Sequence, residues 1–315
     1  MLSAIVLLLV AFLLIRLVGS AVRHFVAWLG SGKSIHQMAD GSIPVEDAYA
    51  EDIRVLVRDV TIWKDEHSGL DRLRSGRPKL TRDQKRAAQR AIDAARQAYL
   101  DVLHLGWYQI VIVFLIGSVL GLLLEEVWMY VTAGLTQSRV GLVWGPFSPL
   151  YGFGAVFLTL ICWGLRKRHA NDLVIFLTSV AVGGGLEQLT GWAMETLIHA
   201  SSWTYLQLPD HITQWVAWRF LVMWGILGLI WAKAIMPDVL YRIGMPTTKR
   251  QAAFVALLAV YLAADIGMTI ACFGRMEARK QGIPPQSGFD EWVDEHYTDQ
   301  FIAARFQNLV IGDGS

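Results

Sequence analysis

The residues Gly-Leu-Val-Trp-Gly-Pro-Phe-Ser-Pro-Leu-Tyr-Gly-Phe-Gly, positions 141–154, combine four glycines and two prolines with long apolar sequences on either side. Proline lacks a backbone donor and glycine loses the most backbone freedom on folding, so a regular helix is disfavoured here. Within a bilayer, irregular backbone persists only where protein or a watery cavity satisfies its polar groups. The stretch therefore predicts a buried, irregular start of a membrane helix that faces the centre of a small bundle.

The composition is that of an integral membrane protein. Of the 315 residues, 54% are hydrophobic and 17% charged, and the mean hydropathy is +0.40. A soluble domain has about a quarter of its residues charged, and several apolar runs here approach the roughly 20 residues needed to cross a bilayer. The net charge of +1 indicates no nucleic-acid partner. We expect an all-α, polytopic membrane helix bundle whose main partner is the lipid bilayer.

We expect about six transmembrane helices, at 1–18, 107–131, 141–165, 171–199, 215–236 and 252–273. Lys and Arg are concentrated in 19–106, 166–168 and 242–250, and these segments alternate with loops that carry few charges. Because cytoplasmic loops are enriched in Lys and Arg, this alternation predicts both termini outside the cytoplasmic (inner) membrane. The expected domains are an uncleaved anchor (1–18), a cytoplasmic basic helical hairpin (19–106), a five-helix membrane core (107–273) and an extracytoplasmic tail (274–315).

The hairpin is expected to contain amphipathic helices at 45–63 and 81–103. Between Arg72 and Arg96 there are nine Lys or Arg residues and two Asp. Such a cluster fits contact with anionic lipid headgroups, and it equally fits a solvated hairpin.

Charged residues inside the expected spans fall at similar depths. At about 1.5 Å per helical residue, Glu125 lies roughly 27 Å, Glu187 roughly 22 Å and Asp265 roughly 20 Å from the cytoplasmic start of its span. Arg219, one turn inside the outer end of the fifth span, falls at a similar level. Charges at mid-membrane cost about 2.5–3.5 kcal/mol each on insertion scales, which favours partners or a cavity.

The neighbouring residues support a polar site. Gly183, Glu187, Gly191 and Glu195 recur every fourth residue and so share one helix face. Gly117 and Gly121, on the face of Glu125, predict the close approach of another helix. We expect a ligand-binding site with an acidic excess in the outer half of the membrane, lined by Glu125, Glu187, Glu195, Arg219, Asp265, Tyr151, Gly145 and Pro146. The alternative is structural, with Arg219 pairing with the carboxylates to hold the bundle together.

Motifs for several chemistries are missing from the sequence. There is no Gly-x-x-x-x-Gly-Lys-Ser/Thr loop, no Cys/His pair with zinc spacing and no His-Glu-x-x-His. We therefore expect no cofactor, no metal and no catalytic residue. Cys162 and Cys272 are expected to lie far apart as buried, reduced side chains.

The stretch 141–154 resembles the Gly-Phe-Leu-Tyr-Gly-Pro-Phe-Cys-Pro-Ile-Tyr-Gly-Phe-Gly signature of the type IV ABC-transporter permease family (CmpB-like). The likeness covers 107–242, and the arginine that the family has directly before the first glycine stands one place earlier, at Arg139. Further matches follow in the family's order: Glu187, Thr190-Gly191-Trp192, Glu195, Trp203, Tyr205, Arg219-Phe220, Trp224 to Gly228 and Pro237. The resemblance implies a multi-span, permease-like subunit, with a separate ATPase subunit or a second copy of the chain as partner.

Three functions fit these observations. The first is a transport or ligand-binding membrane protein with the acidic site described above. The second is an intramembrane enzyme acting on lipid, with Glu187 or Asp265 as general acid or base. The third is a scaffold or sensor, in which every charge is paired and the basic hairpin reports the state of the bundle.

Overall fold

The computed structural model describes residues 93, 96–97, 99–198, 200–246 and 248–311. The expected anchor at 1–18 and nearly all of the expected hairpin at 19–106 lie outside these residues. The described part is mostly helical, and five of its helical stretches are long and apolar enough to cross a membrane. They are Trp107–Ala133, Pro149–Lys167, Asp172–Thr196, Trp218–Ile243 and Lys249–Lys280.

The chain divides into two compact units. The smaller comprises 1–109 and 237–252, and the larger comprises 110–236 and 253–315. In the smaller unit, the rings of Tyr99 and Tyr241 meet edge to face at 5.7 Å. The side-chain amide of Gln109 donates to the carbonyl of Gly244 at 2.8 Å.

The connection between the first two described helices is irregular, as expected for its glycines and prolines. Helix α6 (Trp107–Ala133) ends before it, and α7 (Pro149–Lys167) follows it. Pro149 is at the first position of α7, where the N–H that proline lacks would have no partner within the helix. The non-helical part is therefore shorter than expected, because residues 149–154 already belong to the helix.

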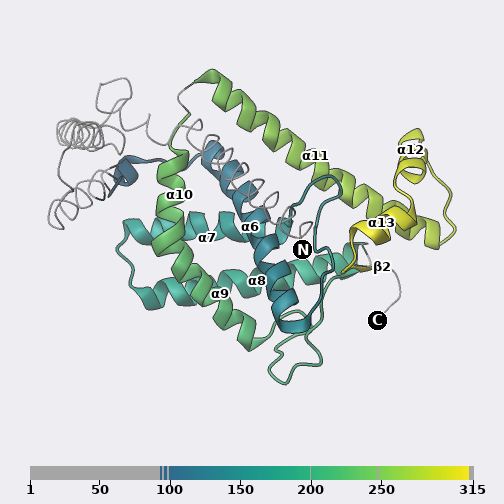
Figure 1. Ribbon diagram of the computed structural model, residues 1–315, viewed down its shortest axis with the longest axis horizontal. Coiled ribbons are helices and arrows are strands. Elements are labelled where there is room, and N and C mark those ends of the chain that lie inside the picture. The colour runs from purple at the N-terminus through teal and green to yellow at the C-terminus, as the bar shows by residue number, and fades with distance from the viewer. Residues whose placement is uncertain (1–92, 94–95, 98, 199, 247, 312–315) are drawn as a thin grey trace, which may run out of the picture. The chain divides into compact units, whose positions relative to one another are not determined.

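The next two spans pack against each other. Helix α8 (Asp172–Ile198) contacts α9 (Trp218–Ile230) and also α7 (Figure 1). Past α9 the helix widens into a π-helical segment, Trp231–Ile235, and continues as α10 (Met236–Ile243). The expected end of this span near Pro237 is thus wrong, because a π-helical turn relieves the clash that proline makes with the preceding turn.

The last span carries a small C-terminal cap. Helix α11 (Lys249–Lys280) is followed by α12 (Gly288–His296) and α13 (Asp299–Arg305), which lie near its C-terminal end (Figure 1). Strand β2 (Val310–Ile311) then pairs antiparallel with β1 (Ala200–Ser201), directly after α8. Residues 134–148, 200–217 and 281–311 therefore meet at one end of the larger unit, called the loop end below.

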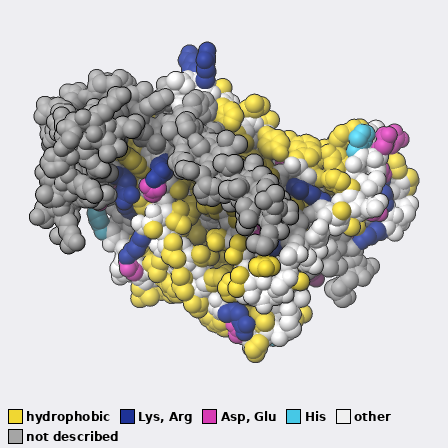
Figure 2. Space-filling view, viewed as in Figure 1, with side chains coloured by type: hydrophobic (Ala, Val, Ile, Leu, Met, Phe, Trp, Pro, Cys, Tyr) yellow, Lys and Arg dark blue, Asp and Glu magenta, His cyan; other side chains and the backbone are white. Residues whose placement is uncertain are grey.

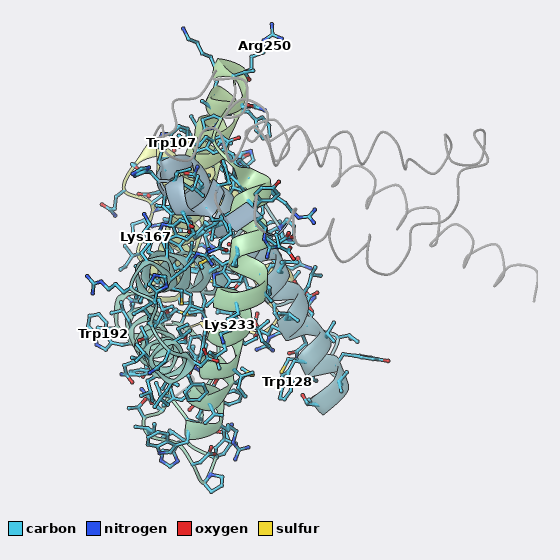
Figure 3. All side chains as sticks on the ribbon, turned by 90° about the vertical axis from the view of Figure 1, so that its left-hand side faces the viewer. Trp107, Trp128, Lys167, Trp192, Lys233 and Arg250 are labelled. Carbon is cyan, nitrogen blue, oxygen red and sulfur yellow. The ribbon has the colours of Figure 1, made fainter. Side chains whose placement is uncertain are left out.

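Large apolar side chains cover the outside of the spans. Trp128 on α6 and Trp192 on α8 are about half exposed and lie on the outer surface (Figure 3). Hydrophobic side chains also follow α11 along the face shown in Figure 2. In water such a surface would be costly, and in a bilayer it is the surface that lipid covers.

Candidate functional site

Glycines allow α6 and α7 to approach closely beside Glu125. A Cβ at Gly121 would lie 2.2 Å from the Cβ of Tyr151, and one at Gly117 would lie 2.4 Å from the Cβ of Ala155. The small-residue surface expected from the sequence is confirmed as this contact. It directs the Tyr151 side chain toward the Glu125 carboxylate.

Glu125 has a cationic partner in the loop that follows α6. The Arg139 guanidinium forms a salt bridge with Glu125, and the two side chains are only 11% and 21% exposed. Arg139 was not among the residues that the sequence predicted to line the site. An open groove of about 490 Å³ at the end of α6 is lined in part by their sequence neighbours Glu126 and Ser138, but by neither Glu125 nor Arg139.

Glu187 is the most buried of the predicted glutamates, with 6% of its surface exposed. The Trp224 indole N–H donates to its Oε1 at 3.0 Å. Its Oε2 is fully buried and has no hydrogen-bond partner among the described residues. A buried carboxylate oxygen without a partner is costly, and each such atom calls for an explanation.

Glycines on α8 position the partner of Glu187. A Cβ at Gly183 would lie 2.0 Å from Cγ of Trp224, so only glycine admits the indole at this point. The ring of Tyr151 stacks on that of Trp224, and the two ring centroids are 6.5 Å apart. The acidic face expected on α8 is therefore covered by aromatic rings from α7 and α9.

Tyr205, in the loop after α8, completes the group. Its ring stacks on that of Phe220 at 4.6 Å. Burial, together with the nearby carboxylates of Glu187 and Glu125, raises the pKa of Tyr205 well above its usual range. Its hydroxyl therefore stays protonated at neutral pH. We call the set Glu125, Arg139, Tyr151, Glu187, Tyr205 and Trp224 the acidic cluster.

Asp265 has a different role, because it anchors the irregular bend. Its Oδ1 accepts from the backbone N–H of Trp144 at 2.9 Å, and its side chain is completely buried. One turn along α11, the Thr269 hydroxyl accepts from the N–H of Val143 at 3.0 Å. A carboxylate and a hydroxyl on one face of α11 thus satisfy two donors that no helix or sheet could use.

Arg305 also holds this bend. Its guanidinium donates to the carbonyl of Leu142 at 3.1 Å and to that of Gly145 at 2.6 Å. Gly145 is buried while Pro146 is exposed. Nothing in the sequence pattern connected Arg305, in the C-terminal tail, with this stretch.

Two of the predicted residues lie in other surroundings. Glu195, near the end of α8, accepts from the side-chain amide of Gln214 at 2.9 Å. Arg219 pairs with Asp210 at 2.7 Å, and its side chain is 51% exposed. The sequence-based expectation that Arg219 meets the buried carboxylates is wrong, since Asp210 in the preceding loop provides a nearer partner.

Among the described residues, no group of three His, Cys, Asp or Glu side chains is arranged to hold a metal ion. Cys162 and Cys272 are buried free thiols.

Apolar helices of spanning length, packed around buried acidic and aromatic side chains, define a multi-pass helical membrane protein. Residues 112–270 match the family described as "Putative ABC-transporter type IV" (ABC_trans_CmpB). The chain belongs to this family of transporter-like membrane proteins. The match extends beyond 242, where the visible likeness ends, and includes most of α11. No curated protein and no solved structure matches the chain.

Proposed function

We propose that this protein is a permease-like membrane subunit that binds a cationic, or hydrogen-bond-donating, group at the acidic cluster. The observation that carries the proposal is the Glu187 carboxylate. It lies inside the bundle, and Trp224 satisfies one of its oxygens while the other has no partner in the part of the chain that the structure describes.

The balance of charge supports a cation. Glu125 and Arg139 neutralise each other, so Glu187, when ionised, contributes one negative charge that no side chain of the cluster compensates. A negative charge without a partner at membrane depth is costly. A bound cation would offset that cost, and the hydroxyls of Tyr151 and Tyr205 would supply further polar contacts.

The surrounding residues support access from the loop end. An open groove lined by Glu126, Tyr130 and Ser138 lies at the end of α6, and Glu126 is half-buried there. The basic residues Arg166, Lys167 and Arg168 lie at the opposite, C-terminal end of α7. By the positive-inside rule, the loop end then faces away from the cytoplasm of a cell-membrane protein.

Energy for transport would come from another chain. The sequence has no phosphate-binding Walker loop, so a separate ATPase subunit would have to bind and hydrolyse the nucleotide. A second copy of the chain is the other partner that the proposal allows.

Thermal unfolding of the purified, full-length protein tests the proposal, with Na⁺, tetramethylammonium and putrescine as probes. Wild type should be stabilised by at least one probe in a saturable manner. Glu187→Gln should abolish the effect because the amide removes the charge. Glu291→Gln, which changes an exposed carboxylate on α12, should retain it. The proposal would be refuted if a probe still stabilises Glu187→Gln. It would also be refuted if no probe stabilises wild type.

A scaffold is the second candidate, because most of the predicted charges have protein partners. Glu125 pairs with Arg139, Arg219 pairs with Asp210, and the Asp265 carboxylate binds the backbone of the bend. In that case no probe should stabilise the protein, and Glu187→Gln should raise its stability by removing a buried charge.

A further inference from the structure

The cap, defined as α12 and α13 (288–305), is firmly attached to the end of α11. Arg275 donates to Asp294 at 2.6 Å, and Arg279 forms salt bridges with both Asp294 and Asp299. Val293 and Ile302 are completely buried in the same cluster as Phe273. Ionic and apolar contacts together fix which face of α12 points outward.

That outward face is aromatic. Phe289 and Trp292, three residues apart on α12, are 52% and 39% exposed, and their rings stack at 6.2 Å. His296 stacks on Trp292 at 4.8 Å. At about 100° per residue, Glu291 lies on the other side of the helix, whereas Glu295 lies between Glu291 and Trp292; both glutamates are exposed. We call Phe289, Trp292 and His296 the aromatic edge.

The aromatic edge continues an apolar surface that belongs to a membrane span. Helix α11 exposes Leu257, Val260 and Ile270, and its hydrophobic side chains extend toward the cap in Figure 2. The salt bridges attach α12 to the last turns of α11, where a spanning helix leaves the hydrocarbon region. Aromatic side chains are enriched at this depth, and amphipathic helices lie in this plane.

We propose that the aromatic edge of α12 rests in the phospholipid headgroup region beside α11. Helix α12 has four acidic residues and no Lys or Arg, so burial of aromatic surface, and not attraction to anionic lipid, drives the contact. The same cap carries Arg305, which holds two carbonyls of the bend. The membrane surface thereby helps to set the position of the bend. This inference does not depend on the proposed ligand site.

The test places a fluorescent label on each side of α12. Phe289→Cys and Glu291→Cys are made in the full-length chain, labelled with the environment-sensitive dye NBD and reconstituted in phosphatidylcholine vesicles. Cys162 and Cys272 are buried, so the labelled parent protein provides the background. Quenching is measured with phosphatidylcholine carrying a spin label on its acyl chain near the headgroup. Trp292→Cys is a second probe of the aromatic edge.

The dye at position 289 should emit at shorter wavelength and be quenched about threefold more than at 291, because an interfacial helix inserts its apolar face by ~5–10 Å. Adding phosphatidylglycerol should leave this difference unchanged. Equal quenching at 289 and 291, or free access of iodide to both, would overturn the proposal. A label shielded from lipid and iodide alike would also overturn it, and would identify a protein partner, such as a second copy, on this face.

Discussion

Replacing Gly183 by alanine should uncouple Trp224 from Glu187. The new Cβ would lie 2.0 Å from Cγ and 2.3 Å from Cδ2 of the indole, so the ring must move. Its N–H now donates to Glu187 at 3.0 Å, and a shifted ring would leave both carboxylate oxygens without a partner.

The expected cost combines two terms. Forcing extra volume into a packed contact costs about 1–3 kcal/mol. Losing a hydrogen bond within a membrane bundle costs about 0.6–1.7 kcal/mol. The free energy of unfolding of Gly183→Ala should therefore fall by about 2–4 kcal/mol relative to wild type.

The native thiols provide the assay. Cys162 and Cys272 are buried, so a thiol-reactive dye reports unfolding in detergent as temperature rises. Gly185→Ala is the matched control, because it lies two residues away on α8 and a Cβ there would meet nothing within 4 Å. If Gly183→Ala unfolds at the same midpoint as Gly185→Ala, the argument for this contact is refuted.

Three further changes have defined outcomes. Arg139→Gln should lower the free energy of unfolding by about 2–4 kcal/mol, because it leaves Glu125 unpaired in a largely buried site; the same thiol assay measures it, and Arg139→Lys should recover part of the loss. Arg219→Gln should leave the unfolding midpoint unchanged, since its pair with Asp210 is exposed, and a large drop would contradict the surface assignment. The two arginine partners of Asp294 hold the pKa of this carboxyl below its usual range. The contribution of the carboxylate to stability is therefore complete above its pKa in the unfolded chain, and it is lost as pH falls through its pKa in the folded protein. Proteolysis of the cap should therefore accelerate at acid pH in wild type, and Asp294→Asn should be cut quickly at neutral pH too.

The sequence predicted the class of fold because hydrophobic length is a strong signal in a membrane protein. The expected spans at 107–131, 171–199 and 252–273 correspond to α6, α8 and α11. Spacing also predicted that another helix approaches Gly117 and Gly121, since residues four apart lie on one face, but it did not identify that helix as α7. The sequence did not predict that this span continues beyond Pro237, because the π-helical segment that makes the continuation possible has no sequence signal comparable to the one given by Pro237.

The partners of the charged residues could not be predicted in the same way. Depth along a helix indicates which charges lie at one level, but not which way each side chain turns. Arg219 pairs within its own loop, and Arg139 provides the buried cation for Glu125. Arg305 comes from a segment beyond the family match, so neither spacing nor resemblance indicated it.

The hydrogen bonds between Arg305 and the bend also have a consequence for biosynthesis. The guanidinium is 160 residues further along the chain than the Gly145 carbonyl that it binds. At about 5–20 residues per second, roughly 10–30 s of translation separate the two. During that interval the nascent hairpin of α6 and α7 must stay in the insertion machinery or keep its bend hydrated, so a ribosome stalled before codon 305 should leave this hairpin open to degradation.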